Sequence, residues 1–338
     1  MNKRLLTALL SVMVLAGCER TPTLEQFGGQ TMGSTYSVKY VADANTPSVE
    51  ALKIQTERYL AEIDQLFSTY REDSVVAEFN ALPAGQCLTV APAVRQMVEA
   101  AAQLSELSNG AFDVTVAPLL KLWGFGPHQH ALNVPSAEAI DKARALVGYQ
   151  HVRVDADQLC KDAAVILNFN SIVAGYAVDQ VVAQLKAAGV KSMLVEITGE
   201  LKAVGKKPDG SAWRIAIEAP RTDAQIAQRI VELDGLGVST SGDYRNYFEQ
   251  DGKRYSHTLD PSLGTPIKHA LASVTVVDAL TLQADGLSTL LMVLGPDEGL
   301  AFAELNGIAA FFVVHSEQGF STFASSMFKR RFGDGENQ

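Results

Sequence analysis

Cysteine, aromatic residues and basic residues are all scarce in this 338-residue sequence. Three cysteines are too few for a structural zinc site built on cysteine. The 28 lysines and arginines are outnumbered by 38 acidic residues, and the net charge of −10 argues against non-specific binding of nucleic acid, which needs a basic face. With 47% hydrophobic and 20% charged residues, the chain is expected to form a sizeable core, as one two-lobed domain or two domains.

The sequence also lacks the common phosphate-binding and hydrolase motifs. No G-x-G-x-x-G follows a predicted strand, and residues 199–207 have neither the spacing nor the Ser/Thr of a P-loop. Ser241 stands where a nucleophile elbow over residues 237–241 would require glycine. After the N-terminal segment, no stretch approaches the roughly 18 unbroken apolar residues of a membrane span. These motifs therefore give no indication of the chemistry, and no later membrane span is expected.

The first 18 residues have the composition of an export signal. Two basic residues precede an apolar run over residues 5–15, and small residues follow. Leu15-Ala16-Gly17-Cys18 also resembles a bacterial lipobox, in which cleavage leaves the cysteine as a lipidated N-terminus. We expect residues 1–18 to be a lipoprotein signal peptide and the acyl chains on Cys18 to hold the protein on a membrane surface. The alternative is an ordinary signal peptide with a chance cysteine. Residues 19–30 are expected to be a polar tether.

Cys87 and Cys160 remain in the exported chain. An oxidising compartment permits a disulfide between them, but both have apolar neighbours and could equally be two buried thiols. The sequence leaves both alternatives open.

The mature chain contains runs of strands broken by pairs of helices, which favours an α+β fold over a regular βαβ repeat. Apolar residues at helical spacing predict helices over 52–67, 93–108 and 175–188, and from about residues 283 and 297. Strands are expected over 34–41, 165–169, 193–197, 201–204, 213–218 and 272–277, with hairpins at 244–259 and 308–324, while 239–243 reads as a loop of small residues.

Asp285 and Thr289 open an apolar helical pattern and lie four residues apart, on one face of the predicted helix. A carboxylate and a hydroxyl there could bind a hard cation such as Mg²⁺. Alternatively, Asp285 is only a charge favoured by the dipole at a helix start.

His257 stands at the end of a predicted strand, close in sequence to Asp260. It could act as a general base that Asp260 orients, or it could be a hydrogen-bonded structural histidine. His128 and His130 lie in a polar loop with no third ligand in view and are expected to be solvated.

Several segments together resemble the ApbE flavin transferases, the family of FAD:protein FMN transferases. The resemblance covers about residues 29–323 in the expected order, and its most specific blocks are 241–247 and 255–261. The other matching segments are 33–36, 67–71, 109–118, 175–179 and 284–295.

The resemblance implies an α+β fold related to the T-fold, with mixed or antiparallel sheets flanked by helices. It implies one two-lobed catalytic unit over residues 31–328, followed by a polar tail over 329–338. Many members are periplasm-facing lipoproteins, which agrees with the lipobox and implies attachment to a bacterial membrane, here expected to be the inner membrane.

The resemblance also implies a Mg²⁺-dependent reaction. A serine or threonine hydroxyl of a partner protein attacks the FMN phosphorus of FAD, AMP leaves, and FMN stays on the protein through a phosphodiester. Family targets are membrane-associated electron-transfer subunits, such as those of sodium-pumping NADH:quinone reductases. Two other functions compatible with the residues are Mg²⁺-dependent hydrolysis of FAD and lipid-anchored flavin binding without turnover.

The family's site residues map onto this sequence one by one. His257 matches the catalytic histidine, with Asp260 a candidate orienter. Asp285, Thr289 and the backbone carbonyl of Val173 match the metal positions. The FAD site is expected to include Met32, Tyr70, Ala111, Phe112, Asp113, Ser171, Arg245 and Tyr255.

The sequence departs from the family pattern at two positions. Asn168 replaces a usual carboxylate, and Ala174 replaces a usual lysine. A lysine near a pyrophosphate aids binding or stabilises the transition state, so another cation is expected to compensate. The candidates are Lys202, Arg245 and Arg254.

Overall fold

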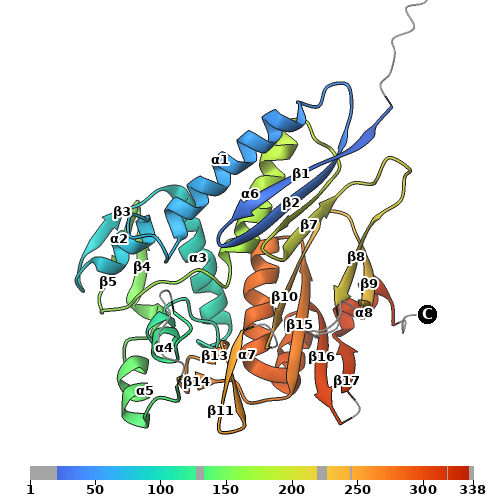
Figure 1. Ribbon diagram of the computed structural model, residues 1–338. Helices are drawn as coiled ribbons and strands as arrows, with labels where there is room; N and C mark the ends of the chain where they lie inside the picture. Colours follow the sequence, from blue (N-terminus) through green and yellow to red (C-terminus); the bar gives the residue numbers. More distant parts are fainter. Residues whose placement is uncertain (1–20, 127–132, 219–226, 244–245, 318, 335–338) are drawn as a thin grey trace, which may run out of the picture.

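The computed structural model of the protein describes residues 21–126, 133–218, 227–243, 246–317 and 319–334 (Figure 1). The signal peptide with Cys18, His128, His130 and Arg245 lie outside the described residues. Among the described residues, no helix has the length and apolar character to cross a membrane.

One eight-stranded sheet forms the centre of the molecule. Its strand order is β1-β2-β6-β7-β10-β15-β16-β17, and each neighbouring pair is antiparallel. Together with the helices, this confirms the α+β prediction. The strands are β1 Thr23–Thr31, β2 Ser34–Ala42, β6 Met193–Ile197, β7 Glu200–Val204, β10 Leu236–Gly242, β15 Leu271–Asp278, β16 Ala309–Ser316 and β17 Gly319–Ala324.

The sheet is covered on both faces because its central strands are apolar at successive positions. In β16, Phe312 packs into the larger core, while its neighbour Phe311 packs into a second core on the opposite face. Three helices cover the first face: α1 (Val49–Phe67), α6 (Val173–Ala187) and α7 (Thr281–Leu305). The second core lies against the hairpin β8 (Trp213–Glu218) and β9 (Ala227–Leu233) and against α8 (Ser326–Phe332).

A smaller lobe lies beside the sheet (Figure 1). It contains a three-stranded sheet in the order β3-β5-β4, in which Cys87 pairs with Cys160. These two cysteines form a disulfide, which resolves the alternatives that the sequence left open. The elements are α2 Val75–Ala81, β3 Cys87–Thr89, α3 Pro92–Leu107, α4 Ala117–Leu122, α5 Ala137–Arg144, the 3₁₀ turn Tyr149–His151, β4 Val152–Asp155 and β5 Gln158–Lys161.

Two short hairpins connect this lobe to the sheet. The first, β11 (Tyr247–Gln250) with β12 (Lys253–Ser256), turns at Asp251 and Gly252, both of which have positive φ. The second pairs β13 (Leu259–Asp260) with β14 (Thr265–Pro266). Trp123 after α4 packs on both hairpins, through stacking on Tyr255 and a hydrogen bond to the carbonyl of Gly264 at 2.9 Å.

The predicted tether is wrong from residue 23 onward, because Thr23–Thr31 is the edge strand β1. Its two central glycines gave the segment the appearance of a linker. A side chain at Gly28 would lie 2.7 Å from the carbonyl oxygen of Tyr36, and one at Gly29 would lie 2.8 Å from its ring. Glycine is therefore required for β1 to approach β2 closely.

The segment 165–169 is extended but is not part of a sheet, so the predicted strand is wrong. Its alternating side chains are buried, as in a strand, at Val165, Leu167 and Phe169. The amide of Asn80 replaces a neighbouring strand: its oxygen accepts from the N–H of Leu167 at 2.7 Å, and its nitrogen donates to the Leu167 carbonyl at 2.9 Å.

Two further predictions need correction. Residues 239–243 do not form a loop, because most of them continue strand β10 between β7 and β15. The polar tail also starts later than predicted, since α8 continues to Phe332. Phe328 of α8 is buried in the second core, and the Arg229 guanidinium donates to the Phe332 carbonyl at 2.7 Å.

Candidate functional site

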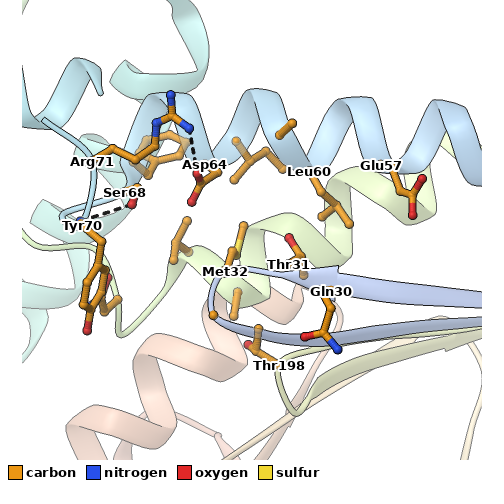
Figure 2. A pocket seen from close by; sticks show the side chains of 17 residues that line it. Gln30, Thr31, Met32, Glu57, Leu60, Asp64, Ser68, Tyr70, Arg71 and Thr198 are labelled. Carbon is orange, nitrogen blue, oxygen red and sulfur yellow. Dashed lines mark hydrogen bonds and ion pairs between the residues drawn. The ribbon is translucent and has the colours of Figure 1, made fainter. Parts of the chain in front are cut away.

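A cavity of about 960 Å³ lies between α1, the β1–β2 turn and the start of α6. Met32, at the turn, has a positive φ of 48°, which is unusual for a residue other than glycine. Figure 2 shows its side chain between the β1–β2 strands and α1, with Tyr70 and Arg71 toward one end. Tyr70 is 64% exposed. Two of the predicted FAD residues, Met32 and Tyr70, thus share this cavity, which we call the large cavity.

A second cavity of about 300 Å³ adjoins the large one, since Asn170 lines both. We call it the catalytic cavity. Predicted site residues from four separate parts of the chain line this one cavity. Ala111, Phe112, Asp113, Ser171, His257, Asp285 and Thr289 all line it. Val173, the third predicted metal position, lines the large cavity at the start of α6.

Asp285 is 6% exposed and lies in the first half of α7. One carboxylate oxygen accepts from the backbone N–H of Gly175 at 2.9 Å, and the other from the Ser239 hydroxyl at 3.3 Å. Burial, and then repulsion from Glu200, raises the pKa of this carboxyl well above its usual range. Glu200 itself lines the catalytic cavity. The described ion pairs include none to Asp285, and a bound cation would stabilise the charged form of this buried carboxyl.

Hydroxyl groups surround the Asp285 side of the cavity. Ser239 and Ser241 lie on the same face of β10, the face toward α7, and their hydroxyls are 3.2 and 2.9 Å from the Ser288 hydroxyl. The Ser241 and Thr289 hydroxyls are 3.4 Å apart. Carboxylate and hydroxyl oxygens are the ligands that Mg²⁺ accepts, so the donors present suit a hard divalent cation and not a soft one.

His257 also lines the catalytic cavity, directly after β12. Its Nδ1 is 3.0 Å from the carbonyl oxygen of Asn246, which can only accept. Nδ1 therefore carries the proton, and Nε2 is left with a free lone pair. Burial lowers the pKa of this imidazole, against the opposing effects of the Asn246 carbonyl and the charge of Asp243. The side chain is thus neutral at neutral pH and suited to accept a proton.

Asp260 does not orient His257, and that prediction is wrong. Its Oδ1 accepts from the hydroxyl of Ser262 at 2.6 Å and from the backbone N–H of Ser262 and Leu263 at 2.8 and 3.1 Å. These bonds form the turn between β13 and β14. The Asn246 carbonyl holds the imidazole instead. Sequence spacing could not identify this carbonyl, because it comes from the preceding hairpin.

Other predicted residues are engaged in the structure of their own segments. The carboxylate of Asp113 accepts from the Thr115 hydroxyl and N–H at 2.6 and 2.7 Å and from the Tyr149 N–H at 3.0 Å, so it shapes the loop that places Ala111 and Phe112. Burial raises its pKa. Tyr255 stacks between Trp123 and Phe248 and does not line either cavity among the described residues.

The structure shows where the two departures from the family pattern, Asn168 and Ala174, lie. Asn168 lines the catalytic cavity, and its side-chain oxygen accepts from the Asn170 N–H at 2.9 Å. This bond holds the turn that carries Asn170, the residue that lines both cavities. Ala174 lines the large cavity. Among the described lining residues of both cavities, Arg71 is the only lysine or arginine, and it also pairs with Asp73 at 2.8 Å.

Two of the cations suggested as replacements have other partners. Lys202 is buried and donates to Asp179 at 2.7 Å and to the carbonyl of Ala279 at 2.6 Å. Arg254 lies 3.6 Å from the ring centre of Tyr247. Neither lines the two cavities, so the suggestion that Lys202 or Arg254 takes the place of the missing lysine has no support in the structure.

Helix α7 breaks at Gly295, with φ 81°. Pro296 has no N–H, so the carbonyl of Met292, four residues earlier, loses its helical partner. The Nε2 of His269 lies 2.9 Å from that carbonyl oxygen and donates to it, while Nδ1 accepts from the N–H of Leu271 at 3.3 Å. Burial lowers the pKa of His269, which favours this neutral form. His269 thereby fixes the end of the helical segment that carries the cavity residues.

A wide cavity beside a narrow one, with a buried carboxylate, hydroxyls and a neutral imidazole near it, is the arrangement expected of an enzyme site for a large substrate. Comparison with known proteins gives the family. A family model described as the ApbE family matches residues 32–312.

Named relatives agree over almost the whole chain. A FAD:protein FMN transferase of Vibrio cholerae is 41% identical over 325 residues, covering 96% of this chain and 97% of that protein. One from Haemophilus influenzae is 37% identical and covers 97% and 98%. The crystal structure of Pseudomonas stutzeri flavinyl transferase ApbE, apo form, superimposes with a TM-score of 0.88 at 62% identity, over 93% of this chain and 98% of that one. The chain belongs to the ApbE family.

Sequence reasoning missed Glu200 and Asn170 as cavity residues. Glu200 follows Thr198 and Gly199, which have φ of 57° and 120° and reverse the chain between β6 and β7. The small residues at this turn were a usable signal, but only the sheet order shows that the turn opens on the cavity.

The His269 contact predicts a specific loss of stability. Replacing His269 by Ala leaves the Met292 carbonyl without its donor and should lower the free energy of unfolding by about 1–3 kcal/mol. His269→Gln, whose side-chain amide can donate, should retain most of it. Urea unfolding at pH 7.5 measures both variants.

The pH dependence provides the control. Because the pKa of His269 is lowered in the folded state, its contribution is present above the unfolded pKa of about 6.5 and is lost as the pH falls below it. His269→Gln should therefore lose less stability than the wild type between pH 7.5 and 5.5. Equal acid sensitivity in the two proteins would contradict the assignment.

Proposed function

We propose that the protein transfers FMN from FAD to a serine or threonine hydroxyl of a target flavoprotein and releases AMP. The observation that supports it best is that Asp285 and His257 line one cavity of about 300 Å³, which adjoins a cavity of about 960 Å³. The large cavity is within the size range of small-molecule sites and suits the bulk of FAD. The named relatives have the same activity in their names.

The transfer exchanges one phosphorus–oxygen bond for another. The acceptor hydroxyl oxygen bonds to the FMN phosphorus, the bond to the AMP oxygen breaks, and AMP carries away the electron pair. The hydroxyl proton goes to Nε2 of His257, whose lone pair is free because Nδ1 donates to Asn246. The target is proposed to be a membrane-associated electron-transfer subunit that carries the acceptor residue.

Asp285 and Thr289 are proposed to bind Mg²⁺, together with the backbone carbonyl of Val173. The fit rests on the buried Asp285 carboxylate with no described cationic partner and on the cluster of hydroxyl oxygens beside it. Bound there, Mg²⁺ would neutralise charge that develops on the pyrophosphate oxygens. Gly175 gives Asp285 a fixed orientation through its N–H, so the carboxylate is held for this role before the substrate arrives.

His257→Gly tests the base. The variant should lose FMN transfer by about 10²–10⁴-fold while its affinity for FAD stays unchanged, since the imidazole acts on the acceptor and not on FAD. In the wild type, the rate should fall as the pH falls through the lowered pKa of His257, and this acid limb should be absent from the residual activity of the variant. Covalent flavin fluorescence of a target subunit on a denaturing gel gives the rate.

The same assay separates the alternatives. Release of AMP and FMN from FAD without labelled protein would indicate FAD hydrolysis, in which water replaces the acceptor. Binding of FAD without release of AMP would indicate a flavin-binding protein. Loss of FAD binding in His257→Gly would show that the side chain is a wall of the FAD site and not the base.

Asp285→Asn tests the metal site. The amide keeps an oxygen for the Gly175 N–H but removes the negative charge, so saturation with Mg²⁺ should need at least tenfold more metal, or activity should be lost at all concentrations. Rates of FMN transfer across a Mg²⁺ titration measure this. Asp209→Asn, at an exposed loop carboxylate, is the control and should titrate like the wild type. An Asp285→Asn curve that overlies the wild type would refute the assignment.

We also propose that the protein is a lipoprotein of a bacterial inner membrane and faces the periplasm. The support is the lipobox at residues 15–18 and the disulfide between Cys87 and Cys160, which suits an oxidising compartment. Cys18→Ala should abolish incorporation of labelled palmitate and move the protein from the membrane fraction to the soluble one. Unchanged palmitate labelling in that variant would place the lipid elsewhere, and no labelling of the wild type would refute the lipoprotein assignment.

A further inference from the structure

A third cavity, of about 370 Å³, adjoins the catalytic cavity at the β13–β14 hairpin. Ala111 and Val293 line both cavities. The segment 259–261 separates the two cavities and contributes to the wall of each. Leu259 and Pro261 line the catalytic cavity, whereas Asp260 lines the third one. We call this third cavity the hairpin groove. Its other lining residues include Leu263, Lys268 and Glu298.

The hairpin groove and the large cavity reach the catalytic cavity through different residues. The large cavity meets it at Asn170, near the start of α6. The groove meets it at Ala111 and Val293, near the end of α3 and the break in α7. In Figure 1 the β13–β14 hairpin lies by the lower end of α3 and α7, away from the β1–β2 turn that borders the large cavity. Two separate approaches thus lead to one site.

The proposed reaction needs two such approaches. The attacking and leaving oxygens lie roughly in line on either side of phosphorus, so the acceptor must approach from the side opposite the AMP part of FAD. The acceptor hydroxyl is also attached to a protein backbone, and a cavity of about 300 Å³ that already contains the pyrophosphate has no room for that backbone. The backbone must lie in an adjoining groove from which one side chain reaches His257.

We propose that the hairpin groove binds the acceptor segment of the target protein in an extended conformation, with its serine or threonine directed over Ala111 and Val293 toward His257. This rests on the proposed function. The groove offers an apolar contact at its rim, where Leu263 is 60% exposed, and charged groups of both signs on its walls, Lys268 and Glu298. An exposed apolar side chain beside mixed charges is typical of the edge of a protein-binding site.

The test measures the KM for acceptor and for FAD separately. The probe is the detergent-solubilised apo form of the flavin-carrying subunit of a sodium-pumping NADH:quinone reductase, and the assay is the initial rate of covalent flavin attachment. Leu263→Glu should raise the KM for this subunit about tenfold. The KM for FAD and the slow release of AMP to water without acceptor should stay unchanged. Leu305→Glu is the control, because Leu305 is 86% exposed and lines none of the three cavities.

A second pair of variants tests the opposite wall on α7. Glu298→Arg places a longer side chain in the hairpin groove and should also raise the acceptor KM several-fold. Asp297→Arg makes the same charge change at the adjacent exposed residue, which does not line the groove, and should leave it unchanged.

The outcomes are distinct. An unchanged acceptor KM in both Leu263→Glu and Glu298→Arg overturns the proposal, as does an equal rise in the KM for FAD. If the wild-type protein attaches no flavin to any acceptor, the proposed function itself fails. If the wild type attaches flavin and the acceptor KM is unchanged in the variants, the proposed function stands and only the role of the hairpin groove is refuted.

Discussion

The carboxylate of Asp179 joins the elements on which the site depends. It lies in α6 and accepts from the Lys202 ammonium of β7 at 2.7 Å, from the Thr281 hydroxyl at 3.0 Å and from the Leu282 N–H at 3.0 Å. The last two belong to the first turn of α7, where a carboxylate is favoured by the helix dipole. Lys202 and Asp179 are both largely buried, so removal of either would leave an unpaired charge inside the protein. This network fixes where α7 begins, and therefore where Asp285 and Thr289 lie.

Glycine allows α6 and α7 to come close enough for that contact. A side chain at Gly175 would lie 2.5 Å from the Thr281 carbonyl oxygen and 2.8 Å from Cβ of Asp285. The same approach places the Gly175 N–H on the Asp285 carboxylate at 2.9 Å. At its other end, the segment is closed by His269 on the Met292 carbonyl. Asp285 and Thr289 thus lie on a helical segment that is held at both ends by hydrogen bonds, as a pre-formed site requires.

Local sequence pattern was sufficient where an element is defined by its own residues. It predicted β2, α1, α6 and the Asp251–Gly252 turn, because periodicity and turn residues decide these locally. The prediction failed where the structure of a segment depends on a residue far away in the sequence. The glycines of β1 are explained only by the close approach of the Tyr36 ring in β2. In residues 165–169, the Leu167 backbone hydrogen-bonds to the Asn80 amide instead of to a neighbouring strand. The resemblance named His257, Asp285 and Thr289, and the fold brings them to one cavity. Neither could show that Lys202 is committed to Asp179, or that a carbonyl of Asn246 holds His257.

The disulfide between Cys87 and Cys160 links residues 73 positions apart. The loop that it closes contains α3, the segment Ala111–Asp113 on the catalytic cavity, and α5. This part of the site therefore belongs to a covalent ring. A single cut by a protease in residues 88–159 would therefore leave the two pieces joined until a reductant opened the ring.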